Sequence, residues 1–295
     1  MDHLVGRVPL VAWHRPGRAA PDDARGIVWQ PVDILDRAGV VRAIAQARPS
    51  RVFHVAGASR LDTAWVNVVP HLETNVLGTH HVLEALRDVG GPCRIVIVSS
   101  AMVYRVGADP IDESAPLLPG SPYGLTKLAQ DQRGLRAFAD DGLDVVIARP
   151  FNHVGPRQTP GFAVSNFARQ IALIEAGRGE PEIRVGNLDA RRDLTDVRDV
   201  ADAYERLMQS GTSGRAYNIC SGKAVRMGDV LEELLRHSRT AVRVVTDESR
   251  LRPNDMPIFV GDATRIEREV GWRPRYSLSD TLRDTLDWWR AEVRA

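Results

Sequence analysis

Tyr123 and Lys127 are four positions apart and could together transfer a proton. Lys127 and Lys223 are the two lysines among 39 lysine and arginine residues, so position 127 is predicted to need a primary amine, which arginine does not offer. Residues at i and i+4 share a helix face, and an ammonium beside a phenol favours its ionised form. We therefore expect Tyr123 to shuttle a proton near neutral pH.

Two serines, Ser99 and Ser100, end an apolar run that starts at Arg94. The run is typical of a buried strand in a parallel sheet, and ligands gather at the carboxyl ends of such strands. A Tyr-x-x-x-Lys spacing is common by chance. Together with the two hydroxyls upstream, however, it predicts a catalytic site.

Composition excludes several classes of partner and ligand. The chain has 295 residues, 26% of them charged, and a net charge of +1, which argues against nucleic acid or a membrane surface as the main partner. No apolar run approaches the length of a membrane span and no signal peptide is visible, so a cytoplasmic location is expected. Cys93 and Cys220 lack metal-ligand spacing and are expected to be buried apolar side chains, with no metal site.

Short β-branched runs alternate with helical stretches, a pattern typical of βαβ units on a parallel sheet. The predicted strands are Val8–His14, Ile27–Gln30, Val52–Ala56, Ile95–Ser100, Val145–Pro150 and Ala216–Cys220. The predicted helices are Arg37–Ala47, Thr79–Val89, Gly124–Asp141, Val197–Gln209, Met227–Arg236 and Asp280–Arg294. The fold class is therefore α/β, a Rossmann-like doubly wound parallel sheet with a smaller lobe.

The alternation breaks after Phe151, where proline, glycine and arginine become frequent. We expect a dinucleotide-binding domain at residues 1–160, to which 193–222 returns. Residues 161–192 and 223–295 are expected to form the substrate lobe.

The usual opening of a dinucleotide fold is missing from this sequence. Such folds begin with a strand, a glycine-rich turn and a helix whose N-terminus binds the pyrophosphate. Here Met1–Arg7 reads as the end of that helix, and the second strand follows. In the strand order 3-2-1-4-5-6 the first strand lies in mid-sheet, so its loss leaves unpaired backbone groups on both flanks. We expect Met1 to be an internal methionine preceded by roughly two dozen natural residues.

Taken together, these motifs resemble a known enzyme family. The serine pair, Tyr123, Lys127 and Arg149–Pro156 stand in the register of extended short-chain dehydrogenase/reductases that act on nucleotide sugars. Four further segments resemble the GDP-6-deoxy-4-keto-mannose reductases: Gly161–Phe167, Val185–Leu188, Arg192–Asp199 and Leu251–Asp255. The resemblance spans nearly the whole chain. It implies reduction of the C4 ketone of GDP-4-keto-6-deoxy-D-mannose to GDP-D-rhamnose by a nicotinamide cofactor.

The resemblance implies a role for each catalytic residue. Tyr123 would protonate the C4 oxygen, Ser100 would hydrogen-bond the developing oxyanion, and Lys127 would hold the nicotinamide ribose and lower the tyrosine pKa. Ser100 matches the family's hydroxyl, in preference to Ser99, when the segment is aligned on Tyr104.

The residues after the second strand indicate which cofactor binds. An acidic residue there selects NAD, whereas arginine suits the 2′-phosphate of NADP. This chain has Arg15 and Arg18, so NADP(H) is expected, with NAD(H) as the alternative. The resemblance implies that the other cofactor contacts are Asp33, Ala56, Gly57, Ala58, Asn75, Tyr123, Lys127 and Pro150.

The resemblance also implies the contacts to a GDP-sugar. Arg192 and Arg252 would bind the diphosphate, because a guanidinium matches phosphate oxygens; as an alternative they are only surface arginines. Asn152 would orient the sugar, with capping of a turn as the alternative role. The remaining substrate contacts implied are Ser100, Val164, Asn166 and Asp255.

Met102 discriminates between reaction types. Two positions before Tyr104, related 4,6-dehydratases carry a glutamate, and epimerase-reductases that make GDP-fucose carry a cysteine. A thioether neither donates nor accepts a proton at neutral pH, so simple ketone reduction is favoured. Two alternatives remain: reduction or 4-epimerisation of another nucleotide sugar, and a non-catalytic nucleotide-sugar binder if the short N-terminus is genuine.

Members of this family often pair through two long helices. Here Thr79–Val89 and Gly124–Asp141 are expected to form a four-helix bundle in a homodimer. The apolar faces of these helices could equally belong to the core of one chain.

Overall fold

The computed structural model describes residues 4–20, 26–107, 110–250 and 256–294. By its internal contacts the chain forms two compact units. The first consists of Met1–Tyr104, Leu117–Arg149 and Tyr204–Ala216, and the second of Arg105–Pro116, Pro150–Ala203 and Tyr217–Ala295. The second unit therefore includes residues 105–116, 150–160, 193–203 and 217–222, which we expected in the dinucleotide-binding domain, and the functional division of the chain stays a prediction.

A parallel sheet lies at the centre of the first unit. Its strands β3 (Arg51–His54), β4 (Arg94–Val98) and β5 (Asp144–Pro150) are parallel neighbours, and the sheet order is β3-β4-β5-β9, with β9 at Ala216–Ile219. The middle of β4, Ile95–Ile97, has no exposed surface. This burial agrees with the apolar run in the sequence, and the expected α/β class with a parallel sheet is confirmed.

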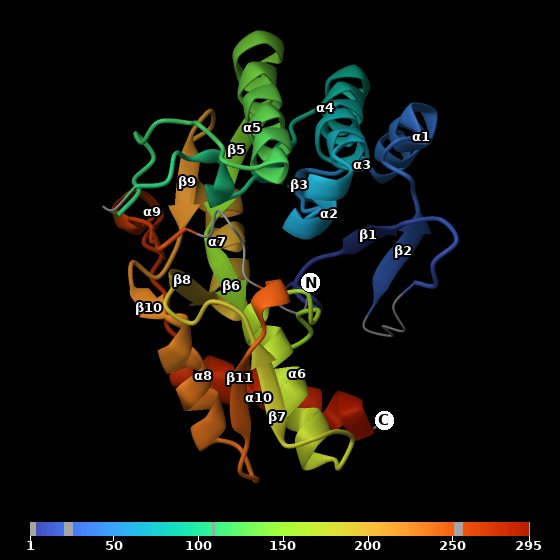
Figure 1. Cartoon of the computed structure of the whole chain (residues 1–295). Helices are drawn as coiled ribbons and strands as arrows, with labels where there is room; N and C mark the ends of the chain where they lie inside the picture. Colours follow the sequence, from blue (N-terminus) through green and yellow to red (C-terminus); the bar gives the residue numbers. More distant parts are fainter. Residues whose placement is uncertain (1–3, 21–25, 108–109, 251–255, 295) are drawn as a thin grey trace. The chain divides into compact units, whose positions relative to one another are not determined.

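Three helices of the first unit lie side by side: α1 (Arg37–Ala47), α4 (Gly78–Val89) and α5 (Pro122–Asp141) (Figure 1). Their apolar side chains share one core with β4 and β5, which includes Val40, Ile44, Val82, Leu83, Leu86, Ile95, Ile97, Ala137, Val145 and Ile147. The predicted bounds of α1 are confirmed, and α4 and α5 each begin one or two residues earlier than expected.

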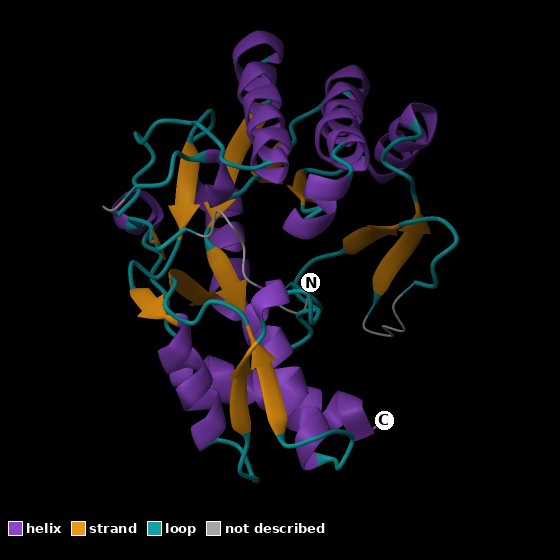
Figure 2. Ribbon diagram, viewed as in Figure 1, coloured by secondary structure: helices purple, strands orange, loops and turns teal. Residues whose placement is uncertain are grey.

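The first unit also contains a separate two-stranded parallel sheet, formed by β1 (Leu10–His14) and β2 (Ile27–Pro31) (Figure 2). No strand pairing among the described residues joins β1 to β3. In the expected order 3-2-1-4-5-6 the first strand lies between these two, so the break falls at that position. Three apolar side chains of these strands remain 46–64% exposed, Val11, Val28 and, just after β3, Val55.

Local sequence explains both ends of α5. Ser121 is the N-cap, and its Oγ accepts a hydrogen bond from the backbone N–H of Gly124 at 3.0 Å. Pro122 occupies the first turn, where its missing N–H costs nothing. Gly142 ends the helix in the left-handed conformation at φ 67°.

The second unit combines short strands with helices. Its elements include β6 (Asn152–Val154), α6 (Ala163–Glu175), β7 (Glu182–Val185), β8 (Arg191–Asp196), β10 (Ala224–Arg226), α8 (Met227–Arg236), β11 (Arg243–Thr246), β12 (Ile258–Phe259), α9 (Thr264–Val270) and α10 (Leu278–Arg294), and α7 (Val197–Ser210) is divided between the two units. Strand β8 pairs with β6, β10 and β12, and β7 pairs with β11. The helices α6, α8 and α10 pack around a shared apolar core (Figure 2).

Several elements were not predicted. The helix α6 follows a helical apolar spacing, with Val164, Phe167, Ala168 and Ile171 all buried. The sequence therefore carried this signal, but the helix was not predicted because proline and glycine are frequent around it. The short elements α2 (Leu61–Val66), α3 (Val69–Leu72) and the π-helical turn η1 (Glu73–Leu77) are each too short for a periodic pattern.

Within the part of the chain that is described, no helix combines the length and the apolar character needed to cross a membrane.

Candidate active site

Tyr123 lies in the first turn of α5 and is 8% exposed. Burial raises the pKa of its phenol, and a hydrogen bond with the side chain of Ser100 opposes this rise. The net effect is a raised pKa, so the phenol holds its proton at neutral pH. A buried, protonated phenol beside a second hydroxyl is suited to donate a proton.

The two serines after β4 have different partners. Ser100 is the N-cap of the 3-10 turn η2 (Ala101–Val103), and its Oγ accepts a hydrogen bond from the backbone N–H of Met102 at 3.2 Å. The Oγ of Ser99 instead donates to Oδ2 of Asp131 at 3.2 Å. These contacts support Ser100 as the hydroxyl that serves Tyr123, and they assign Ser99 a structural role.

Lys127 is 5% exposed, and its Nζ donates to the carbonyl oxygen of Val98 at 2.6 Å and to Oε1 of Gln130. Burial lowers the pKa of Lys127 to about 7, and the carboxylate of Asp131 opposes this fall. The pKa of Tyr123 is raised, and its causes are burial and Ser100. Lys127 is not among these causes, and our expectation that it lowers the tyrosine pKa stays a prediction.

A buried ion pair, missed from the sequence, lies next to these residues. Nε of Arg149 donates to Oδ2 of Asp131 at 2.7 Å, and its Nη1 donates to the hydroxyl of Tyr104 at 2.8 Å. The exposure of all three side chains is at most 4%. Asp131 follows Lys127 by one helical turn, a spacing that indicates a neighbour of Lys127 but not the pairing with Arg149, 18 positions away.

Close packing brings α5 to the serine loop. A Cβ atom on Gly124 would lie 2.4 Å from the carbonyl oxygen of Met102 and 2.9 Å from Cβ of Pro119. Any side chain at position 124 would therefore push the start of α5, and with it Tyr123, away from Ser100.

The first unit also contains the residues expected to bind the nucleotide. Arg15 and Arg18 are exposed in a turn after β1, and neither guanidinium has a side-chain partner among the described residues. Oδ1 of Asp33, after β2, accepts a hydrogen bond from the backbone N–H of Leu35 at 2.9 Å. Two unpaired cations at the end of β1 fit an anionic group such as a ribose phosphate.

Asn75 supports the turn formed by Ala56, Gly57 and Ala58 after β3. Its Oδ1 accepts from the backbone N–H of Ala58 at 2.8 Å, and its Nδ2 donates to the carbonyl oxygen of Ala58 at 3.1 Å. A Cβ on Gly57 would lie 2.9 Å from Oδ1 of Asn75. The side-chain amide is therefore committed to the backbone, so Asn75 shapes the turn. A turn without side-chain bulk fits the close approach of a dinucleotide.

The expected substrate residues of the second unit have contrasting environments. Asn152 is exposed and donates from Nδ2 to the carbonyl oxygen of Asp193 at 3.3 Å. Asn166, on α6, accepts at Oδ1 from Nη1 of Arg250 at 3.1 Å. Nη1 of Arg192, on β8, donates to a backbone oxygen at 2.6 Å.

Val164 is 4% exposed and belongs to the apolar core of the second unit. Its side chain packs against protein, and a contact with substrate at this position stays a prediction. Pro150 is buried at the end of β5. Arg252 and Asp255, which were also expected to contact substrate, lie outside the described residues.

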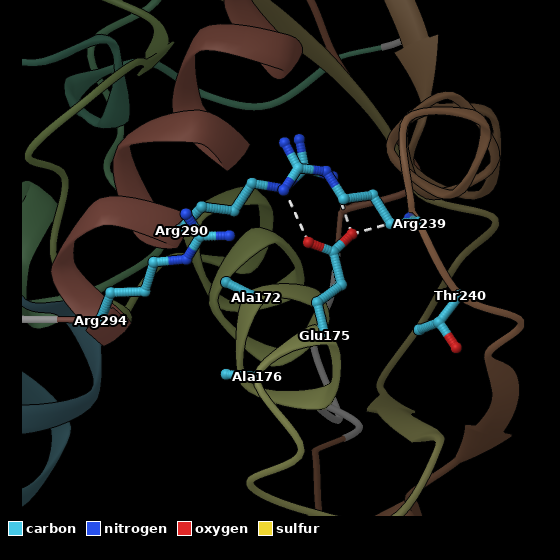
Figure 3. A pocket seen from close by; sticks show the side chains of 7 residues that line it. All are labelled: Ala172, Glu175, Ala176, Arg239, Thr240, Arg290 and Arg294. Carbon is cyan, nitrogen blue, oxygen red and sulfur yellow. Dashed lines mark hydrogen bonds and ion pairs between the residues drawn. The ribbon is translucent and has the colours of Figure 1, made fainter.

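A small pocket of about 100 Å³ is found elsewhere in the second unit, between α6 and α10 (Figure 3). Nε of Arg290 donates to Oε2 of Glu175 at 2.7 Å within it. None of the predicted site residues lines this pocket, and the ion pair connects the two helices. The described residues contain no group of histidine, cysteine or acidic side chains that could hold a metal ion.

Comparisons of the sequence place this site in a family context. The family model described as GDP-mannose 4,6 dehydratase matches residues 15–285. The GDP-6-deoxy-D-mannose reductase of Pseudomonas aeruginosa is 34% identical over 97% of this chain and 92% of the relative. UDP-glucose 4-epimerase 4 of Oryza sativa subsp. japonica is 28% identical over 96% of this chain and 81% of the relative.

Solved structures agree with these relationships. The structure of RMD from Pseudomonas aeruginosa complexed with NADPH matches with a TM-score of 0.84 and 31% identity, over 95% of this chain and 92% of that one. The UDP-glucose 4-epimerase of Thermus thermophilus in complex with NAD matches with a TM-score of 0.87 and 26% identity, over 98% and 94% of the two chains.

Proposed function

The chain belongs to the GDP-mannose 4,6 dehydratase family, and from this membership we propose that it reduces the C4 ketone of GDP-4-keto-6-deoxy-D-mannose to GDP-D-rhamnose with NADPH. The family is one of NAD(P)-dependent nucleotide-sugar reductases, dehydratases and epimerases. The observation that carries the proposal is the buried Tyr123, paired with Ser100 and holding its proton at neutral pH.

The proposed reduction needs a proton donor at the C4 oxygen, and Tyr123 supplies it. Its raised pKa keeps the phenol protonated, and Ser100 hydrogen-bonds the same oxygen as negative charge develops there. Lys127 is proposed to hold the nicotinamide ribose, and a reduced nicotinamide supplies the hydride when bound. The residues of the chain therefore transfer the proton and orient the nicotinamide ribose.

Met102 argues against dehydration as the reaction. It lies in the η2 turn, between Ser100 and Tyr104, at the position where the related dehydratases carry an acid. Dehydration must remove a proton from C5, and the thioether of Met102 cannot accept one. The matching family model is named for a dehydratase, and the thioether at position 102 is our reason to propose reduction among the reactions of this family.

We propose NADP(H) as the cofactor, with NAD(H) as the alternative. Arg15 and Arg18 are exposed and unpaired among the described residues, so both guanidinium groups are available to a 2′-phosphate. Asp33 and the turn Ala56–Ala58, supported by Asn75, are proposed to contact the adenosine ribose and the adenine. One relative of known structure was complexed with NADPH, which agrees with this choice.

The GDP-sugar is proposed to contact residues of the second unit. Asn152, Asn166 and Arg192 carry the exposed or half-buried polar groups expected for this role, and Arg252 and Asp255 are added by resemblance alone. A homodimer is also proposed. The apolar face of α4 is core, as Val82, Leu83 and Leu86 show, so pairing would use its outward face and Leu125 of α5.

The test is NADPH consumption in the presence of freshly made GDP-4-keto-6-deoxy-D-mannose. Tyr123→Phe should slow turnover by about a hundred- to ten-thousand-fold, the usual contribution of a general acid. The matched control, Tyr276→Phe at an exposed tyrosine of the second unit, should leave turnover unchanged.

If the chain does not consume NADPH in this assay, the reductase proposal fails. A product formed with no net NADPH consumption would identify a 4-epimerase, the reaction of the two UDP-glucose relatives.

A further inference from the structure

A chain of buried hydrogen bonds continues from Lys127 away from Tyr123. Nζ of Lys127 donates to Oε1 of Gln130, and Nε2 of Gln130 donates to Oγ1 of Thr79 at 2.8 Å. The same Oγ1 lies 2.7 Å from Nε2 of His54. Gln130 and Thr79 have no exposed surface and His54 is 4% exposed. A buried polar chain of this kind is stable only if every member has a partner.

The direction of each bond in this chain follows from Thr79. Its hydroxyl has one proton, which it donates to the carbonyl oxygen of Asn75 at 2.7 Å. Thr79 must then accept from both of its other neighbours. Hence His54 carries its proton on Nε2, and Gln130 turns its NH₂ group to Thr79. The NH₂ of the Gln130 amide therefore faces Thr79, and its oxygen is the atom that remains to bind Lys127.

Lys127 in turn is constrained by its acceptors. An ammonium has three N–H groups. Two of those of Lys127 donate to the carbonyl oxygen of Val98 and to Oε1 of Gln130. The third has no hydrogen-bond partner among the described residues. Buried oxygens fix the directions of two N–H groups. Because the nitrogen is tetrahedral, the direction of the third N–H group is then fixed as well.

We propose that Gln130 is a positioning residue, whose amide is locked by Thr79 and His54 so that it presents oxygen to Lys127 and aims the remaining N–H of the ammonium. The catalytic meaning of this aim rests on the proposed reductase function. The lock itself is a property of the folded chain and can be measured without substrate.

The titratable groups around Lys127 affect its pKa, which is the quantity that the experiment measures. On α5, Asp131 favours the ammonium, while Tyr123 is protonated. On β3, the pKa of His54 is lowered to about 4, by burial first and then by Lys127, so it is neutral at pH 7. On β5, Arg149 is bound to Asp131. The amide of Gln130 stabilises the charged amine, so its removal must lower the pKa of Lys127.

The experiment uses the rarity of lysine in this chain. Carbon-13 labelling of lysine produces signals from Lys127 and Lys223 alone, and Lys223 is exposed and serves as the internal reference. The Lys127 signal should titrate with a midpoint near its pKa of about 7. Gln130→Met removes the acceptor at similar volume and should lower this midpoint by about one pH unit. Gln130→Glu keeps an acceptor and adds a negative charge, so it should raise the midpoint.

A second pair of variants tests the lock directly. Thr79→Val removes the acceptor that orients Gln130 and should lower the Lys127 midpoint, whereas Thr79→Ser keeps the hydroxyl and should restore it. A merely structural role for Gln130 and Thr79 would change stability but leave the midpoint in place. An unchanged midpoint in folded Gln130→Met and Thr79→Val would overturn the proposal. A failure of the reductase assay would not, since the titration involves no turnover.

Discussion

At the residue scale, the charge of Asp131 is what lets two cations share a buried site. Oδ2 of Asp131 accepts from Arg149 and Ser99, while its Oδ1 is buried without a hydrogen-bond partner in the described structure. Lys127 is one helical turn away. The carboxylate therefore compensates Arg149 through direct contact and Lys127 through its field.

Asp131→Asn is expected to remove this compensation. The Lys127 pKa should fall further below about 7, because an anion that favoured the ammonium is lost. Stability should drop by about 3–5 kcal/mol, because Arg149 is left buried and unpaired. Lysine-selective NMR and denaturant unfolding measure the two effects. Asp140→Asn, on the same helix at an exposed pair with Arg136, is the control and should cost no more than about 1 kcal/mol.

Lys127 should also make stability depend on pH. The pKa of Lys127 is about 7 in the folded chain against an ordinary value of 10.5, so the unfolded chain binds more protons between these values. The free energy of unfolding should therefore rise with pH from about 7 to about 10 relative to Lys127→Met. Unfolding curves at several pH values measure the difference. Lys223→Met, the matched control at the exposed lysine, should keep the slope of the wild type, and a Lys127→Met chain with that same slope would contradict the burial of an ionisable amine.

Arg15 and Arg18 should decide the choice of cofactor. The double change Arg15→Ser/Arg18→Ser should raise the KM for NADPH about tenfold or more, since each guanidinium would lose a charge-assisted contact to the 2′-phosphate. Steady-state kinetics with NADPH and NADH measure this, and NADH should be little affected. Arg51→Ser, at another exposed arginine of the first unit, is the control. An equal rise in the KM for NADPH and for NADH would indicate a general electrostatic effect.

At the scale of elements, the site depends on how closely α5 approaches the loop after β4. Gly124 is the contact point, with space for hydrogen but not for carbon beside the carbonyl oxygen of Met102. The buried strand β4 and most of the helix α5 were visible in the sequence, whereas the N-cap at Ser121 was not predicted. The close approach joins residues from two elements, so only their packing reveals it.

Gly124→Ala is expected to shift the start of α5. Turnover should fall about a hundredfold, because displacement of a reacting group by roughly 1 Å has effects of this size. Stability should fall by about 1–3 kcal/mol from overpacking. Gly120→Ala is the matched control, since a Cβ there meets nothing within 4 Å. Crystallography or NMR of the variant should show Tyr123 moved relative to Ser100, and normal turnover would contradict the argument.

At the scale of the whole molecule, the surface of the first unit suggests self-association. Leu125 on α5 is 54% exposed, and α4 carries polar side chains such as His80 and Glu84, whose Nε2 and Oε2 atoms are 3.4 Å apart. Stable dimers bury roughly 1,200–2,000 Å² of total surface, which two helices from each chain can supply. The pairing we propose is therefore largely polar, with Leu125 as an apolar contact.

Leu125→Glu should convert this dimer to monomer, because a charge would be buried without a partner. Sedimentation velocity over a range of concentrations measures the change. Leu118→Glu is the control, since Leu118 is equally exposed at 54% but lies outside α5. A wild-type chain that sediments as a monomer at all concentrations would exclude the four-helix pairing.

The sequence by itself determined the features that depend on local pattern. The apolar run of β4 predicted its burial, the helical apolar spacing predicted α5 to within two residues, and the spacing of Tyr123, Lys127 and the serine pair predicted the candidate catalytic residues. These signals are local because periodicity and capping act within a few residues of the chain. The family followed from segments in register with these residues.

Only the tertiary structure decided the partners of these residues. Gln130 meets Thr79 across 51 positions and Asp131 meets Arg149 across 18, so no local pattern records either contact. For the same reason nothing in the sequence indicated that burial lowers the pKa of Lys127 and that Asp131 opposes this fall. Nothing in it indicated either that the side chain of Val164 belongs to a core assembled from distant segments. Burial and long-range hydrogen bonds arise only when the elements pack, and they decide the protonation on which the proposed chemistry depends.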